Sequence, residues 1–149
     1  MGKNKYMKSG TKITRIKLDE GDNEIDYMIF GIVSAEPDYK ISIAINKKLN
    51  ISLKKSISYE LNGNREITFS RFIDCSGMPE NSSVLVSNKS GDRFLSKKYS
   101  RIDYFLKLSS SIRMKEAGKL LSGLRETSGV VAVFPLKSTE FDTNIFNPY

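Results

Sequence analysis

Apolar residues at every second position predict β-strands along most of this chain. Alternating or uninterrupted apolar runs indicate about seven strands, at residues 12–18, 27–34, 51–61, 67–73, 84–86, 102–109 and 130–134. Between two of these runs, Asn62-Gly63-Asn64 predicts a β-hairpin, because Asn and Gly adopt the backbone angles that hairpin turns require. The alternation breaks near Ser70 and Arg71, which predicts a bulge in the returning strand.

Two further segments carry apolar residues at helical spacing. The first spans residues 36–49: Glu36, Pro37 and Asp38 are residue types that favour the first turn of a helix, and Asn50 predicts its end. The second begins after Ser110 or Ser111, either of which can cap a helix. Its apolar stripe comprises Met114, Ala117, Leu120, Leu121 and Leu124.

These elements predict one α+β domain, with an antiparallel or mixed sheet of about seven strands and two helices on one face. The length of 149 residues fits a single domain. Residues 102–134 predict a C-terminal β-α-β unit whose two strands are parallel neighbours joined by a right-handed crossover. We expect residues 1–11 to form a basic leader, disordered at least in part, and residues 135–149 to form an irregular tail that packs loosely through Phe141 and Phe146.

Most of the net charge of +7 lies near the N-terminus. The first 17 residues hold six basic side chains and no acid, whereas the remaining residues hold 18 basic and 17 acidic side chains. One interpretation is an arm that contacts the phosphates of RNA or another polyanion. The other is a solvated leader that aids solubility or pairs with the acidic turn at residues 19–26. The basic residues are Lys3, Lys5, Lys8, Lys12, Arg15 and Lys17.

The residue types of the chain exclude several kinds of chemistry. There is no histidine, which excludes a Ser–His or Cys–His nucleophile and a zinc site of the usual type. An enzyme would therefore have to use carboxylates and lysines. Cys75 is the single cysteine and no secretory signal is recognisable, so we expect a cytoplasmic protein and interpret Cys75 as a small packing residue. We expect no cofactor and no metal, and, because the longest apolar runs are short, no membrane span.

Five short segments between residues 12 and 140 follow one another in a familiar order and spacing. They are Asp38-Tyr39-Lys40-Ile41, Asn46-Lys47-Lys48-Leu49, Val86-Ser87-Asn88, 102–107 and 136–138. The set resembles a small bacterial family of cytoplasmic proteins, named IPExxxDY after its signature. Asp103-Tyr104 match the end of that signature, whereas Lys97-Lys98-Tyr99 stand where its Ile-Pro-Glu would fall. The resemblance implies residues of shared but unknown role, namely Asp38, Tyr39, Asn46, Lys47, Asn88, Asp103 and Tyr104.

The residues themselves favour structural roles for several of these positions. Asp38 suits the N-terminus of its helix and Tyr39 suits packing, although the two could also form a polar site with Asn46 and Lys47. Asp103 and Tyr104 are successive residues of a strand, so they point to opposite faces and cannot form a joint site there. We expect one of the pair to pack, and the other to face solvent or to pair with a Lys or Arg.

Basic and aromatic residues alternate between positions 97 and 107, around Tyr99, Tyr104 and Phe105. Such a mixture is typical of surfaces that stack on single-stranded RNA, although strand alternation would bury some of the rings. The basic members are Lys97, Lys98, Arg101 and Lys107, and the first three could contact a polyanion.

These observations leave three hypotheses. The first is a non-enzymatic protein-binding or adaptor module, whose partner is another cytoplasmic protein or a second copy of the chain. The alternative is an RNA-binding accessory protein that uses the basic N-terminal arm. An enzyme based on carboxylates and lysines is the least favoured, because no catalytic constellation is recognisable.

Overall fold

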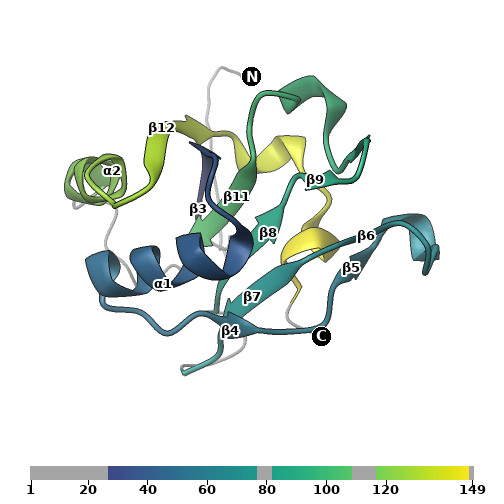
Figure 1. Cartoon of the computed structure of the whole chain (residues 1–149), viewed down its shortest axis with the longest axis horizontal. Coiled ribbons are helices and arrows are strands. Elements are labelled where there is room, and N and C mark those ends of the chain that lie inside the picture. Colours follow the sequence, from purple (N-terminus) through teal and green to yellow (C-terminus); the bar gives the residue numbers. More distant parts are fainter. Residues whose placement is uncertain (1–26, 77–81, 109–116, 148–149) are drawn as a thin grey trace, which may run out of the picture.

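A six-stranded antiparallel sheet forms the centre of the protein (Figure 1). The computed structural model describes residues 27–76, 82–108 and 117–147. The strand order is β12-β3-β11-β8-β7-β4, and every neighbouring pair is antiparallel. Its strands are β3 (Met28–Ser34), β4 (Lys54–Lys55), β7 (Arg71–Asp74), β8 (Ser83–Ser87), β11 (Tyr104–Leu108) and β12 (Val130–Leu136). Two small sheets pair β5 (Tyr59–Glu60) with β6 (Thr68–Phe69), and β9 (Lys89–Ser90) with β10 (Arg93–Phe94).

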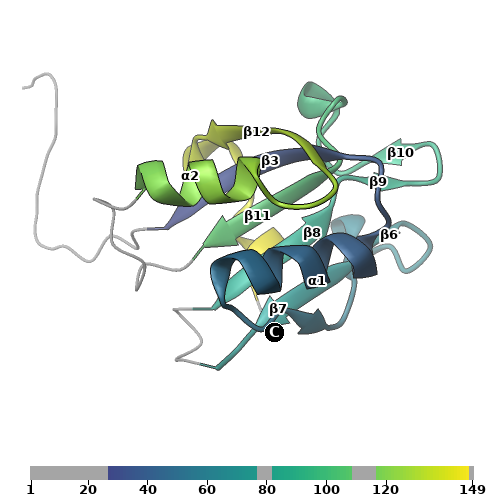
Figure 2. The same ribbon diagram turned by 60° about the vertical axis from the view of Figure 1, so that its left-hand side comes forward.

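Two α-helices cover one face of the sheet, which confirms the predicted α+β class (Figure 2). Helix α1 (Asp38–Leu49) begins directly after Pro37, and it ends at Asn50, whose left-handed backbone (φ 57°, ψ 49°) stops the helix as predicted. Helix α2 (Ala117–Arg125) packs beside α1 and against β12. No helix within the described ranges has the length and apolarity that a membrane crossing requires.

The sheet is buried on both faces, so the protein has two apolar layers. On the helical face, Leu106 of β11 packs with Ile41 and Ile45 of α1. On the other face, Phe105 of β11 packs with Ile145 and other residues of the C-terminal segment. A central strand covered on both sides reads as a continuous apolar run, which is why the prediction of a central strand at 27–34 was confirmed as β3.

The C-terminal β-α-β unit differs from the prediction in one respect. Strands β11 and β12 do run parallel and are connected through α2, but they are not neighbours. Strand β3 lies between them and is antiparallel to both. Because β3 is apolar along its length and buried on both faces, its backbone needs a hydrogen-bonded strand on each edge. It therefore lies between the two strands that were predicted to be neighbours.

The predicted strand at 51–61 is wrong as a continuous element. The structure breaks it into β4 and β5, which belong to different sheets, and the side chain of Ile57 between them is 75% exposed. The hairpin that follows is confirmed, with positive φ angles at Asn62 (52°) and Gly63 (76°). The irregularity expected near Ser70 is present as the junction at which the chain passes from β6 to β7.

The C-terminal segment is more ordered than the predicted irregular tail. After β12 it forms two 3-10 helices, η6 (Ser138–Glu140) and η7 (Thr143–Phe146), and Phe146 is buried rather than loosely packed. Asp142 caps η7 by accepting a hydrogen bond from the backbone N–H of Asn144 (2.9 Å). The expectations for residues 1–26, and for a helix cap at Ser110 or Ser111, lie outside the described residues.

Among the described strands, β12 lies at one edge of the sheet, and it carries no charged residue. Val131 is 74% exposed and Phe134 is 48% exposed. Two features make this edge a poor template for a further strand: Pro135 offers no N–H, and Arg125 of α2 donates a hydrogen bond to the carbonyl of Val133 (3.2 Å).

The central position of β11 yields a stability prediction. Leu106→Ala removes a fully buried side chain from the helical layer, so we expect the free energy of unfolding to fall by about 2–5 kcal/mol. The matched control, Val131→Ala on the exposed edge, should change it by less than about 0.5 kcal/mol. Chemical denaturation of both variants measures this, and similar losses for the two would contradict the layer assignment.

Candidate functional site

Asn88 lies fully buried between β8 and β9 and organises the chain around it. Its amide nitrogen donates to the carbonyls of Tyr99 and Ile102, both at 2.9 Å, and its amide oxygen accepts from the backbone N–H of Ser96 (2.8 Å). These bonds fix η4 (Lys97–Tyr99) against the sheet. Asn88 therefore serves the fold and does not face a ligand.

Asp103 stands just before β11 and joins two other parts of the chain. One carboxylate oxygen accepts from the backbone N–H of Ser34 (2.9 Å), and the other accepts from Nζ of Lys89 (2.7 Å). The expectation that one of the Asp103-Tyr104 pair binds a basic residue is thus confirmed for Asp103.

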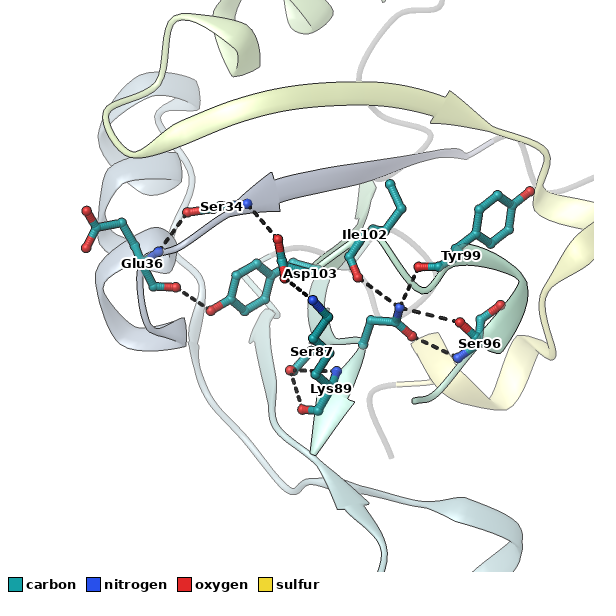
Figure 3. A network of polar contacts seen from close by, with 10 residues as sticks. Ser34, Glu36, Ser87, Lys89, Ser96, Tyr99, Ile102 and Asp103 are labelled. Carbon is teal, nitrogen blue, oxygen red and sulfur yellow. Dashed lines mark hydrogen bonds and ion pairs between the residues drawn. The ribbon is translucent and has the colours of Figure 1, made fainter. Parts of the chain in front are cut away.

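Tyr104 is buried on the helical face, and its hydroxyl donates to the carbonyl of Glu36 (2.6 Å). Burial raises the pKa of Tyr104 to about 12, with a further contribution from the nearby carboxylates of Asp38, Asp103 and Glu36. Both Asp103 and Tyr104 fasten the connection between β3 and α1. Figure 3 shows Asp103 between Ser34 and Lys89. Asp103 and Tyr104 thus position the start of α1.

The four candidate residues of α1 separate into two groups. Asn46 exchanges two hydrogen bonds with the backbone of Leu53, at 2.7 and 3.1 Å, and Asp38 accepts from the N–H of Tyr39 (2.7 Å) in the first turn of the helix. Both are therefore engaged within the fold. By contrast, Tyr39 is 57% exposed, so its predicted packing role is wrong, and Lys47 is exposed as well.

Tyr39 is exposed because α1 buries a different face. Ile41 and Ile45 point into the core, whereas Tyr39, Ile43 and Lys47 follow one another at intervals of four residues along the outer side. Ile43 is 53% exposed. Sequence reasoning missed Ile43, although its spacing from Tyr39 was a usable signal.

This outer side of α1 forms one wall of a cavity of about 610 Å³, which we call the α1 hollow. The opposite wall is the turn at residues 126–128, between α2 and β12. The turn is held in place by a hydrogen bond from the hydroxyl of Ser34 to the carbonyl of Gly129 (2.7 Å). The lining residues are Glu36, Tyr39, Lys40, Ile43, Ala44, Lys47, Lys48, Glu126, Thr127 and Ser128.

Gly129 is required where this turn meets the start of α1. Its φ of +88° is a conformation that other residues rarely adopt, and a Cβ atom there would lie 2.7 Å from Cγ of Glu36. The end of the turn and the start of α1 therefore lie in close contact.

The charges around the α1 hollow are largely paired. Lys40 lies 3.6 Å from Glu36, and Lys48 lies 3.3 Å from Glu126. Within the described ranges Lys47 has no carboxylate partner. The hollow therefore combines an apolar surface with one uncompensated positive charge.

The basic and aromatic residues near η4 are arranged differently from the RNA-stacking pattern. Tyr104 and Phe105 are buried, and the ring of Tyr99 stacks on Phe141 with centroids 5.9 Å apart. Lys98 binds Glu140 at 2.7 Å, and the hydroxyl of Tyr99 donates to the same carboxylate. These rings are thus used inside the fold.

The remaining basic candidates are distributed as follows. Lys97 and Arg101 are exposed beside η4, whereas Lys107 is buried, with Nζ 5.3 Å from the ring centroid of Tyr27. The predicted polyanion contacts of the N-terminal arm lie outside the described residues. Cys75 is exposed, so its interpretation as a packing residue is wrong.

No protein-family model matches this chain, and no curated protein is similar to it. The resemblance to the IPExxxDY proteins therefore stays a prediction.

The structural role of Asn88 can be tested by substitution. Asn88→Ala leaves the carbonyls of Tyr99 and Ile102 buried without this donor, so we expect a loss of about 3 kcal/mol in the free energy of unfolding. The control is Asn144→Ala, an exposed asparagine, which should cost less than about 0.5 kcal/mol. Equal stability of the two variants in urea denaturation would refute the role.

The raised pKa of Tyr104 predicts a loss of stability in alkali. An unfolded tyrosine loses its proton near pH 10, whereas Tyr104 in the fold holds it until about pH 12. The contribution of Tyr104 to the free energy of unfolding is therefore complete below pH 10 and is lost as the pH rises toward 12. Between pH 9 and pH 11 the free energy of unfolding of the wild type should fall by about 1 kcal/mol more than that of Tyr104→Phe. Tyr59 and Tyr99, whose pKa values are also raised, are common to both proteins. Equal losses in denaturation at the two pH values would contradict the assignment.

Proposed function

We propose that this protein is a non-enzymatic protein-binding module of the cytoplasm that docks a segment of a partner protein in the α1 hollow. The observation that carries the proposal is the exposure of Tyr39 and Ile43 beside Lys47, which has no carboxylate partner among the described residues. Soluble proteins rarely gather large exposed apolar side chains around a cavity unless something covers them.

The spacing of these residues defines the shape of the occupant. Tyr39 and Lys47 are eight positions apart on the helix, a rise of about 12 Å, and Ile43 lies midway between them. An amphipathic helix of the partner, with apolar anchors three or four residues apart, matches a ridge of this length. It would pack its anchors between α1 and the turn at residues 126–128.

Charge further restricts the partner. Because Lys40 and Lys48 are already compensated by glutamates, the hollow offers one cation, that of Lys47. The partner helix is therefore expected to carry a carboxylate beside its apolar anchors. Such a rim contact contributes orientation and specificity more than affinity.

Two further inferences accompany the proposal. An exposed free thiol at Cys75 suits a reducing compartment, which supports a cytoplasmic location. We also propose membership of the IPExxxDY family, which rests on the order and spacing of the resembling segments.

Photocrosslinking tests the proposal. A photoreactive phenylalanine analogue replaces Ile43 in one protein and Val131 in another, and each is exposed to nuclease-treated native lysate of the source organism. We expect one protein to crosslink from position 43 at high yield and not from position 131. In a pull-down of the same lysate without the analogue, recovery of this protein should fall at least about ten-fold with Ile43→Asp, the effect of losing a central apolar anchor, and should fall with Lys47→Glu.

Val131→Asp is the matched control, because it places the same charge on another exposed apolar position, outside the α1 hollow. It should leave recovery unchanged, and all variants should unfold within about 1 kcal/mol of wild type. Crosslinking from both positions, or equal recovery by Ile43→Asp and Val131→Asp, would overturn the proposal. Recovery that depends on intact nucleic acid would favour the RNA-binding alternative instead.

A further inference from the structure

Arg71 is a buried cation on the face of the sheet that the C-terminal segment covers. It is the first residue of β7 and only 5% exposed. Within the described residues no Asp or Glu pairs with its guanidinium. A buried charge without a counter-ion generally lowers the stability of a protein by several kcal/mol, so other groups around Arg71 are expected to compensate for this cost.

Three backbone carbonyls satisfy one side of the guanidinium. Nε donates to Ile57 (2.9 Å), and Nη1 donates to both Ile145 (3.1 Å) and Asn147 (2.7 Å). These bonds tie the β4–β5 connection and η7 to the sheet. They are neutral acceptors, however, and leave the positive charge uncompensated.

The other side of the guanidinium faces a second cavity. Nη2 donates no hydrogen bond to any described residue. Among the described residues, Ser82 Oγ is the only buried side-chain polar atom that lacks a hydrogen bond, so Nη2 is accessible to solvent. The cavity, which we call the Arg71 hollow, has a volume of about 340 Å³. Its lining consists of Ile57, Ser58, Tyr59, Glu60, Arg71, Asn144 and Asn147.

We propose that the Arg71 hollow binds a monocarboxylate that carries a small apolar group. The two protons of Nη2 and the hydroxyl of Tyr59 supply donors for the carboxylate oxygens. Tyr59 makes no hydrogen bond within the described residues, and it lies close enough to Arg71 for the guanidinium to lower its pKa, against the larger raising effects of burial and Asp142. The exposed side chain of Ile57 provides the apolar contact.

The negative charges nearby limit the ligand to a single charge. Glu60 lines the hollow, and Asp142 is close enough to raise the pKa of Tyr59. A dianion such as phosphate would meet two carboxylates and one guanidinium, whereas a monocarboxylate neutralises Arg71 alone. A free small acid and the C-terminal carboxylate of a peptide share this chemistry.

Nuclear magnetic resonance of the Arg71 Nε–Hε group tests the site in the full chain. Sodium butyrate should shift this signal to saturation, and the neutral isostere butyramide should not. Acetate should bind at least about three-fold more weakly than butyrate, because it lacks two methylene groups that contact Ile57. A peptide ending in Val, with its C-terminal amide as the control, distinguishes a peptide ligand from a free acid. If the peptide acid binds more tightly than butyrate and the amide does not bind, the ligand is the C-terminal carboxylate of a peptide.

Tyr59→Phe removes one donor, and we expect it to weaken butyrate binding by about three-fold or more. The matched control is Tyr39→Phe, the same change in the α1 hollow, which should bind as wild type does. Arg71→Lys should abolish the saturable response, followed on neighbouring backbone signals, provided that its thermal unfolding remains cooperative. Equal shifts with butyrate and butyramide, or equal affinity of the two Tyr→Phe variants, would show that Arg71 is only a clamp between carbonyls.

Discussion

The whole fold depends on the burial of strand β11 on both faces and along both edges. All five of its residues are buried, Lys107 among them. Antiparallel pairing with β3 and β8 satisfies its backbone, while α1 and α2 cover one face and the C-terminal segment covers the other. The two apolar layers come from different parts of the chain, and they meet only through this sheet. The two layers are therefore not independent, because the loss of apolar side chains that pack on one face of β11 also destabilises the packing on its other face.

The same strand links the fold to the proposed docking surface. The residues at its start hold the β3–α1 connection, since Asp103 binds Ser34 and Tyr104 binds Glu36. That connection sets where α1 begins, and hence where Tyr39 and Ile43 stand in the α1 hollow. The residues that resemble the IPExxxDY proteins thus divide into a supporting set in the interior and a presenting set at the surface. Binding surfaces carried by a fixed helix in this way need little reordering when a partner arrives.

Local signals were sufficient for some elements and not for others. Pro37 and Asn50 delimit α1 through their own backbone preferences, and the Asn62-Gly63 turn does the same for its hairpin, so both were predictable from a few residues. The place of β3 between β11 and β12 is decided by contacts distant in sequence, which alternation cannot reveal. Helical spacing could have shown that Tyr39 and Ile43 share a side, but which side of α1 faces solvent depends on the sheet beneath the helix. The same holds for Arg71. The sequence pattern indicated the irregularity beside it, but its burial depends on acceptors distant in sequence, one of which lies 74 residues away.

The edge formed by β12 has a consequence for the behaviour of the chain under stress. Its sequence, Val-Val-Ala-Val-Phe-Pro-Leu, has the apolar, uncharged character of segments that assemble into cross-β fibrils. Pro135 prevents strand pairing at one end of β12 under all conditions. The carbonyl of Val133, however, is blocked by the side chain of Arg125 from α2, so this protection lasts only while α2 is docked. Local unfolding of α2 would uncover the apolar layer and the bare edge together. Aggregation of this protein should therefore begin from a nearly native state with α2 detached, and not from the fully unfolded chain.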